Sequence, residues 1–382
     1  MSPSMMSGTA MRRVALPLCL LLLTPTVRAQ EVQVDVNSSR RISGESGGLL
    51  RFSAIGTIRV ARSGHVAVLD PTDNRLVLFN PDGQVVGILE AKGRGPRELA
   101  ALSDVCGDPQ RGLRVLDPTG PKVGFVDTSG RVVSERVLGA RAPVGIACPR
   151  GNPGASLVSV ELGTPSPADD ETARLPEGLR PVVFSATLRV WSAENESPKS
   201  VTIPIFADML ALGGGGMPRP LGRGTTVRIS DEGTVFVVRG DSAIVQVLAS
   251  SGAVRSTFRL RPRSVRPTAA DVASAIDDLL ERVPRAVHSR LQALLEAFPP
   301  PRDAPTHRAA VLDDRGRLWV QRSLPSEANT TIEVYSPDGR VIDTIVLPRG
   351  LTLHDVNGGW LAMSQRDADG ASFVQLHRVN GR

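Results

Sequence analysis

The sequence predicts an all-β fold: a six-bladed β-propeller closed by an N-terminal strand, with a small two-helix insertion between blades four and five. Three observations lead to this prediction: a recurring strand-and-turn signal, groups of four strands around it, and one extra strand near the start. The recurring signal reads VLFNPDG (77–83), VGFVDTSG (123–130), LRVWSAENES (188–197), VQVLASSG (245–252), IEVYSPDG (332–339) and VQLHRVNG (374–381). A hairpin signal that recurs with a spacing of tens of residues indicates a repeat architecture, in which each unit buries its faces only against its neighbours.

The first blade shows the pattern in full. Its expected strands, separated by Gly, Pro and Asp-Gly turns, form an antiparallel meander over 53–62, 65–70, 75–80 and 84–92. The second strand of this unit returns at 112–117, 233–240, 316–323 and 358–365. The turn glycines are 47 residues apart from Gly83 to Gly130 and 42 apart from Gly339 to Gly381, which is typical of propeller blades.

Blade three and the two ends depart from the repeat. In blade three, the expected strands 156–163 and 181–191 flank a proline- and acid-rich segment, 164–180, which we expect to be a surface loop. The last blade has only three strands, whereas EVQVDV (31–36) stands alone before blade one. Pairing this strand with the last blade would close the ring and remove a free sheet edge.

The stretch between blades four and five leaves room for helices. From Gly252 to Gly339 there are 87 residues, about twice the length of a blade. Thr268 and Asp271 resemble a capping box, and two apolar faces at helical spacing follow within the insertion 263–302. These faces comprise Val272, Ile276, Leu279, Leu280 and Val283, then Val287, Leu291, Leu294, Leu295 and Phe298. The helices either cover their own propeller or form a lid or a docking surface.

Residues 1–29 read as a secretory signal peptide. Arg12 and Arg13 form a positive region, the apolar run 14–23 is too short to span a bilayer, and the residues just before Gln30 fit a cleavage site. No second long apolar run follows in the sequence. We therefore expect a propeller domain over 30–382 that is secreted or periplasmic and has no transmembrane segment.

The charge pattern argues against a nucleic-acid partner. The chain has 382 residues and a net charge of +6, and three arginines of the signal peptide supply half of this charge. The other arginines are scattered, and aromatic residues make up only 3% of the chain. A nucleic-acid-binding protein usually concentrates basic and aromatic residues on one face. We expect instead a monomer whose partner is an unknown protein or a small ligand.

The segment HVAVLDPTDNRLVLFNPDGQVVGILEAKGRGPREL (65–99) resembles the repeat of NHL-type propellers, and in particular the secreted six-bladed propellers of bacteria. The shared features are an Asp-x-x-x-Asn-Arg turn between two strands, an Asp-Gly turn, and a Gly-x-Gly-Pro-x-Glu loop. The resemblance implies the fold. It does not imply one function, because the relatives include sensor domains, scaffolds, lyases and lactone hydrolases.

Two glycine-rich segments match catalytic motifs only in part. The segment GESGG (44–48) has the Gly-x-Ser-x-Gly pattern of a nucleophile, but a strand follows it instead of the required helix. The segment LGGGGM (212–217) lacks the lysine and hydroxyl of a phosphate-binding loop. We interpret the first as chance or turn chemistry and expect a flexible loop at the second.

A third segment, GRGPRE (93–98), connects blades one and two. It lacks the third glycine of a dinucleotide-binding loop and follows an antiparallel strand. Arg94, Arg97 and Glu98 could contact an anionic ligand at one rim, since guanidinium groups bind carboxylates and phosphates well. The alternative is a structural turn held by internal ion pairs.

The histidines form no local metal-binding motif. The chain has five of them: His65, His288, His307, His354 and His377. His307 and His354 fall on expected innermost strands of blades five and six, so they are candidates for a site in the central channel. Lactone hydrolases of this shape, which are among the relatives, hold calcium in the channel through acidic and amide side chains. The resemblance therefore implies that side chains on separate innermost strands could assemble a metal site there. Packed or solvent-facing histidines are the alternative.

Two cysteines remain after the signal peptide, Cys106 and Cys148. They occupy nearly the same position in adjacent blades, and an oxidising compartment with an even count favours a disulfide between them. The competing interpretation is a pair of buried thiols, because equivalent positions on neighbouring blades can lie beyond the roughly 7 Å Cα separation that a bridge allows.

No catalytic motif in this sequence is complete. The leading hypothesis is therefore a secreted, non-catalytic scaffold that binds a ligand or a protein and needs no cofactor. The alternative from the enzyme class is a metal-assisted, lactonase-like hydrolase or lyase with calcium and a site at the propeller channel.

Overall fold

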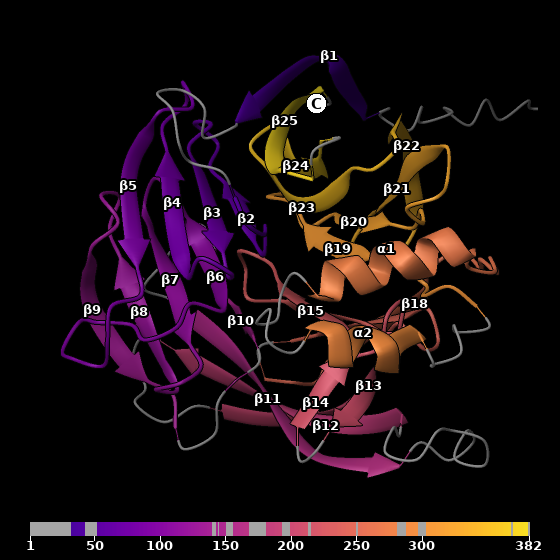
Figure 1. The fold of residues 1–382 in the computed structure, drawn as a ribbon, viewed down its shortest axis with the longest axis horizontal. Coiled ribbons are helices and arrows are strands. Elements are labelled where there is room, and N and C mark those ends of the chain that lie inside the picture. Colours follow the sequence, from indigo (N-terminus) through magenta and orange to yellow (C-terminus); the bar gives the residue numbers. More distant parts are fainter. Residues whose placement is uncertain are drawn as a thin grey trace, which may run out of the picture.

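The computed structural model describes residues 32–42, 52–139, 143, 145–149, 156–167, 181–192, 199–212, 215–249, 251–280, 288–296, 303–367 and 370–380. The predicted signal peptide and the segment 44–48 lie outside these residues. Within them, six antiparallel sheets surround a common centre (Figure 1). Each innermost strand contacts the next around a closed ring: β2 (Ile58–Val60), β6 (Asp104–Asp108), β10 (Gly145–Ala147), β15 (Thr226–Ile229), β19 (Ala309–Leu312) and β23 (Thr352–Asn357). The predicted six-bladed propeller is confirmed.

Blades one and two form the expected four-stranded meanders. Their remaining strands are β3 (Val66–Asp70), β4 (Arg75–Phe79), β5 (Val85–Glu90), β7 (Gly112–Asp117), β8 (Lys122–Val126) and β9 (Val132–Val137). Every residue of β3 is buried because neighbouring blades cover both of its faces, whereas β5 lies outermost and is mostly exposed. In the turn of blade one, the side-chain oxygen of Asn80 accepts hydrogen bonds from the amides of Asp82 and Gln84, and Gly83 adopts a φ of 83°.

Blade three is larger than the sequence predicts. It is a five-stranded sheet of β10, β11 (Ser156–Pro167), β12 (Pro181–Ser192), β13 (Lys199–Leu212) and β14 (Gly215–Pro218). The expected loop 164–180 is wrong over 164–167, which belong to β11. The pairing of β11 with β12 shifts register between Leu162 and Pro165, and such an irregularity is typical where a proline cannot donate a ladder hydrogen bond. The expected loop 212–217 is also wrong in part, because Gly215 to Met217 pair with β13.

Blades four, five and six again have four strands each. Their remaining strands are β16 (Val235–Val238), β17 (Ile244–Leu248), β18 (Val254–Arg259), β20 (Leu318–Gln321), β21 (Asn329–Tyr335), β22 (Val341–Pro348), β24 (Trp360–Arg366) and β25 (Ser372–Asn380). The fourth strand of blade six is β1 (Gln33–Ile42), which runs antiparallel to β25. Ile42 lies opposite Val374 and is buried in the core, so the predicted ring closure by the N-terminal strand is confirmed.

Two helices follow blade four, as predicted: α1 (Ala269–Leu280) and α2 (His288–Glu296), which contact each other (Figure 1). Ile276 and Leu280 of α1 and Leu291 and Leu295 of α2 are buried, so part of each predicted apolar face does pack inward. Val283, Val287 and Phe298 lie outside the described residues. No helix in the described part of the chain has both the length and the apolar character to cross a membrane.

A disulfide joins the innermost strands of blades two and three. Cys106 lies in β6, Cys148 directly follows β10, and their Cα atoms are 5.7 Å apart. This separation is within the range that a bridge requires, because β6 and β10 are neighbours in the inner ring. Both cysteines are buried in a cluster that includes Trp191.

Candidate functional site

A cavity of about 610 Å³ lies between α1 and blades five and six. It opens on the face where the innermost strands begin, since its wall includes residues that precede β2, β19 and β23. The remaining wall comes from α1, from residues of β21, β23 and β25, and from the ends of β20 and β24 with the loops that follow them. The helical insertion therefore covers part of one mouth of the propeller.

The cavity wall carries more basic than acidic side chains. Arg308, Arg349 and Arg366 line it, together with Asp278 of α1 and Asp367. Asp278 forms ion pairs with two of these arginines, at 3.0 Å to Arg366 and 3.8 Å to Arg308. In contrast, Arg349 is exposed and forms no ion pair with any residue that the structure describes. The cavity thus has an excess of positive charge.

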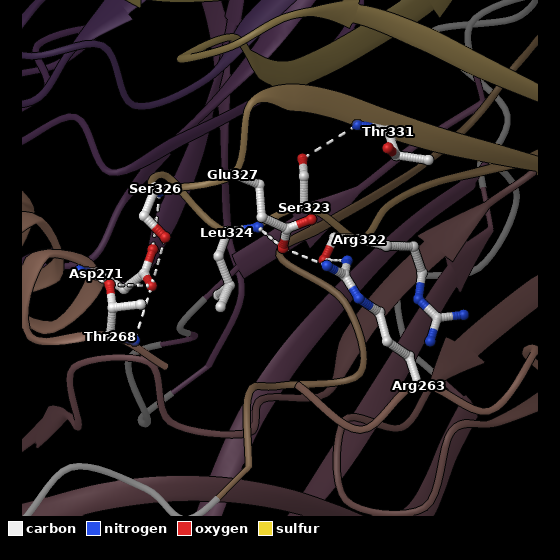
Figure 2. Close-up of polar contacts among 9 residues, drawn as sticks. All are labelled: Arg263, Thr268, Asp271, Arg322, Ser323, Leu324, Ser326, Glu327 and Thr331. Atoms are coloured by element: carbon white, nitrogen blue, oxygen red, sulfur yellow. Dashed lines mark hydrogen bonds and ion pairs between the residues drawn. The ribbon is translucent and has the colours of Figure 1, made fainter. Parts of the chain in front are cut away.

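The first turn of α1 is fixed to the loop that follows β20 (Figure 2). The predicted capping box is present, because Asp271 accepts hydrogen bonds from the amide and hydroxyl of Thr268, and its own amide donates to the Thr268 hydroxyl. The same carboxylate accepts hydrogen bonds from the amide and hydroxyl of Ser326, at 2.8 and 2.7 Å. One buried side chain therefore holds the helix and the loop together.

The loop after β20 is itself held in place by a polar network (Figure 2). Glu327 accepts a hydrogen bond from the amide of Leu324 at 2.8 Å and forms an ion pair with Arg263. Arg263 also donates to the backbone oxygen of Arg322. The hydroxyl of Ser323 accepts a hydrogen bond from the amide of Thr331 at 3.2 Å. Because Ser323 and Leu324 line the cavity, this network gives the cavity a preorganised wall.

His354 lines the cavity and lies at an irregularity in the pairing of β23 with β24 in blade six. Leu353 pairs with Met363 and Asp355 pairs with Ala362, so His354 is an extra residue in a β-bulge. In the described residues of the other five blades, the innermost strand pairs show no register shift. His354 Nε2 lies 2.7 Å from the hydroxyl of Ser364, and both side chains line the cavity.

His307, the other channel candidate, has a different environment. It is buried just before β19, and its two ring nitrogens lie 3.0 and 3.2 Å from the hydroxyls of Thr226 and Thr306. Burial, with a smaller contribution from nearby Arg228 and Arg322, lowers the pKa of His307 to about 4. His307 is not among the residues that line the cavity, so the two candidate histidines do not converge there.

The connector candidates lie at exposed positions between β5 and β6. Glu98 accepts a hydrogen bond from the amide of Gly95 at 2.9 Å, and its own amide donates to the Gly95 oxygen at 3.0 Å. Arg97 adopts a φ of 59° in this turn. Arg94, Arg97 and Glu98 do not line the cavity. Glu98 therefore stabilises the turn through hydrogen bonds with the backbone of Gly95, not through an ion pair with a described residue, and ligand binding by these three residues stays a prediction.

A hollow of about 40 Å³ lies among the innermost strands. Arg59, Arg228 and Asp355 line it, together with both cysteines of the disulfide. Among the described residues, no group of three or more histidine, cysteine, aspartate or glutamate side chains is placed to hold a metal ion. Calcium binding, which the enzyme alternative requires, stays a prediction.

A further hollow of about 650 Å³ lies between blades four and five. Arg259, Arg261 and Arg263 line it at alternate positions, together with Asp241 and Tyr335. Arg263 and Asp241 are engaged in ion pairs, with Glu327 and Arg239 respectively. This local concentration of arginines was not anticipated from the sequence.

Comparisons with known proteins establish the fold and do not identify a family. No family model and no curated protein matches the chain. A member of the DUF4221 family from Bacteroides vulgatus is similar in structure, with a TM-score of 0.53, 9% identity, and coverage of 93% of this chain and 100% of that one. A catalytically inactive virginiamycin B lyase from Staphylococcus aureus, solved with quinupristin, has a TM-score of 0.45, 12% identity, and coverage of 91% and 100%. At 9% identity, the likeness to the DUF4221 protein concerns the fold alone.

Proposed function

We propose that this chain is an extracytoplasmic β-propeller that binds a small anionic ligand in the cavity beneath α1. The observation that carries the proposal is the arginine arrangement: Arg308 and Arg366 share the carboxylate of Asp278, and Arg349 has no ion-pair partner among the described residues. Guanidinium groups bind carboxylates and phosphates in a bidentate manner, so an anion in the cavity would complete the charge balance.

The size and lining of the cavity support a small ligand. Its volume of about 610 Å³ falls in the range typical of small-molecule sites. Polar side chains from separate elements converge on it, including Ser274 of α1, Thr330 of β21 and Thr352 of β23. Such a set of neutral hydrogen-bonding groups beside a few cations is suited to orient a polar anion.

Two features support the extracytoplasmic part of the proposal. The Cys106–Cys148 disulfide is of a kind that persists in oxidising compartments. The first 29 residues have the charge, apolar run and cleavage pattern of a signal peptide. Detection of the processed protein in a periplasmic or culture-medium fraction tests this part directly.

Calorimetric titration with citrate, a small tricarboxylate, tests the ligand class. We expect saturable binding at one site, with an affinity in the micromolar to millimolar range. Arg349→Ala should weaken it about tenfold, because one charge-assisted contact to an anion contributes about 1.5 kcal/mol or more. Arg340→Ala is the matched control, since Arg340 is exposed in the turn between β21 and β22 and pairs with Asp338. Absence of binding at about 10 mM citrate, or equal binding by Arg349→Ala, would reject the anionic ligand class.

A further inference from the structure

The cavity beneath α1 also contains a hydroxyl and an imidazole in contact. We propose that Ser364 is a nucleophile and His354 its general base, and that the cavity hydrolyses a small ester bearing a free carboxylate. This inference rests on the proposed function, because the carboxylate of the substrate would bind at Arg349.

The geometry of the pair fits this role. His354 Nε2 and Ser364 Oγ are 2.7 Å apart, within the range in which a histidine takes a proton from a serine hydroxyl. Both residues are half-buried and line the cavity, so a substrate there can reach them. His354 is the extra residue at the register shift in the β23–β24 pairing. β-Bulges change the direction of side chains and often occur beside active sites. Among the described pairings of an innermost strand with its neighbour, only that of blade six has a bulge.

A second Ser–His contact in the chain lies outside the cavity and serves as a comparison. Ser63 Oγ lies 2.8 Å from His65 Nδ1 in an exposed turn between β2 and β3. Neither Ser63 nor His65 lines the cavity. Ser364, in contrast, shares the cavity with three arginines, and Arg366 lies two residues further along the same strand. Residues two apart on a strand project from the same face, so a guanidinium group accompanies the hydroxyl.

The reaction balances without an added oxidant or reductant. Ser364 Oγ bonds to the ester carbonyl carbon and its proton passes to His354 Nε2, while the guanidinium group of Arg366 stabilises the oxyanion. The carbon–oxygen bond to the alcohol then breaks, and His354 returns the proton to the departing alkoxide. Water then attacks the carbonyl carbon of the acyl-serine and gives a proton to His354. The bond from that carbon to Ser364 Oγ breaks, and His354 returns the proton to Ser364 Oγ. The products are a free acid and an alcohol.

Labelling of the purified full chain with a fluorophosphonate tests the nucleophile. We expect one adduct, located on Ser364 by peptide mapping. Ser364→Ala should abolish it and His354→Gln should slow it about a hundredfold, which is the usual contribution of a general base. Ser63→Ala should label like the wild type. No adduct on Ser364, or labelling that His354→Gln leaves unchanged, would overturn the inference. Circular dichroism melts of each variant confirm that it is folded.

Hydrolysis of mono-para-nitrophenyl succinate, compared with para-nitrophenyl acetate, tests the substrate class. The wild type should prefer the succinate ester, and Arg349→Ala should reduce this preference about tenfold. Equal rates for the two esters would overturn the carboxylate requirement. Citrate titration of Ser364→Ala separates the two proposals. Citrate binding without labelling of the wild type would reject the nucleophile and leave the binding function, whereas labelling without citrate binding would reject the anionic ligand.

Discussion

Asp271 and Ser326 join α1 to blade five through two hydrogen bonds, from the Ser326 amide at 2.8 Å and from its hydroxyl at 2.7 Å. Burial by itself would raise the pKa of the Asp271 carboxyl, but the hydrogen bonds from Thr268 and Ser326 outweigh it and hold the pKa below its ordinary value of 3.8. The carboxylate is therefore stabilised by the contacts that position the helix over the cavity.

Acid should release α1 from the propeller. Because the pKa of Asp271 is lower in the folded state, its stabilising contribution is present above the ordinary value of 3.8 and is lost as the pH falls through the folded value. Hydrogen exchange should show the amides of 269–280 protected at neutral pH and much less protected in acid. Asp271→Ala should reproduce the loss at neutral pH, whereas Asp277→Ala, at an exposed position of α1, should not. Full protection in Asp271→Ala would contradict this role.

The stability of the whole ring should fall between about pH 6.5 and pH 4 because of His307. The pKa of His307 is lowered to about 4, so in this range the unfolded chain binds a proton that the folded chain does not. Stability therefore decreases with falling pH, by roughly 3 kcal/mol for such a shift. Urea unfolding at a series of pH values measures this slope. His307→Gln should flatten it and leave the smaller contribution of His377, whose pKa burial also lowers. An unchanged slope in His307→Gln would refute the assignment.

The N-terminal strand should be essential for ring closure. Ile42 of β1 is buried in the same core cluster as Phe52, Trp360 and Val374, so Ile42→Ala should cost about 2–4 kcal/mol of the free energy of unfolding. Gln33→Ala, at an exposed position of the same strand, is the control and should have little effect. Chemical denaturation measures both variants. Equal stability of Ile42→Ala and the wild type would show that β1 does not close the core.

Local signals explain why the ring could be predicted from the sequence. The turn at Asn80 and Gly83 depends on residues within five positions, and strand alternation needs only a few more. The loop predicted over 164–167 is wrong because the pairing of Pro165 with β12, and the register shift before it, depend on the partner strand. The cavity could not be foreseen either. Asp278, Arg349 and Ser364 come from distant segments, and no local pattern indicates the bulge at His354.

The disulfide between Cys106 and Cys148 should leave no free thiol in the mature chain, which thiol titration measures. In denatured, unreduced protein without residues 1–29, we expect no free thiol, because Cys106 and Cys148 are bridged between blades two and three. The bridge closes a loop with a sequence separation of 42, which restricts the unfolded chain and stabilises the fold by about 4 kcal/mol. The double variant Cys106→Ser and Cys148→Ser should lose about this amount in urea unfolding, and reducing agent should lower the stability of the wild type but not of the variant. Two free thiols per chain, or a variant as stable as the oxidised wild type, would show that the inner strands of these blades need no covalent link.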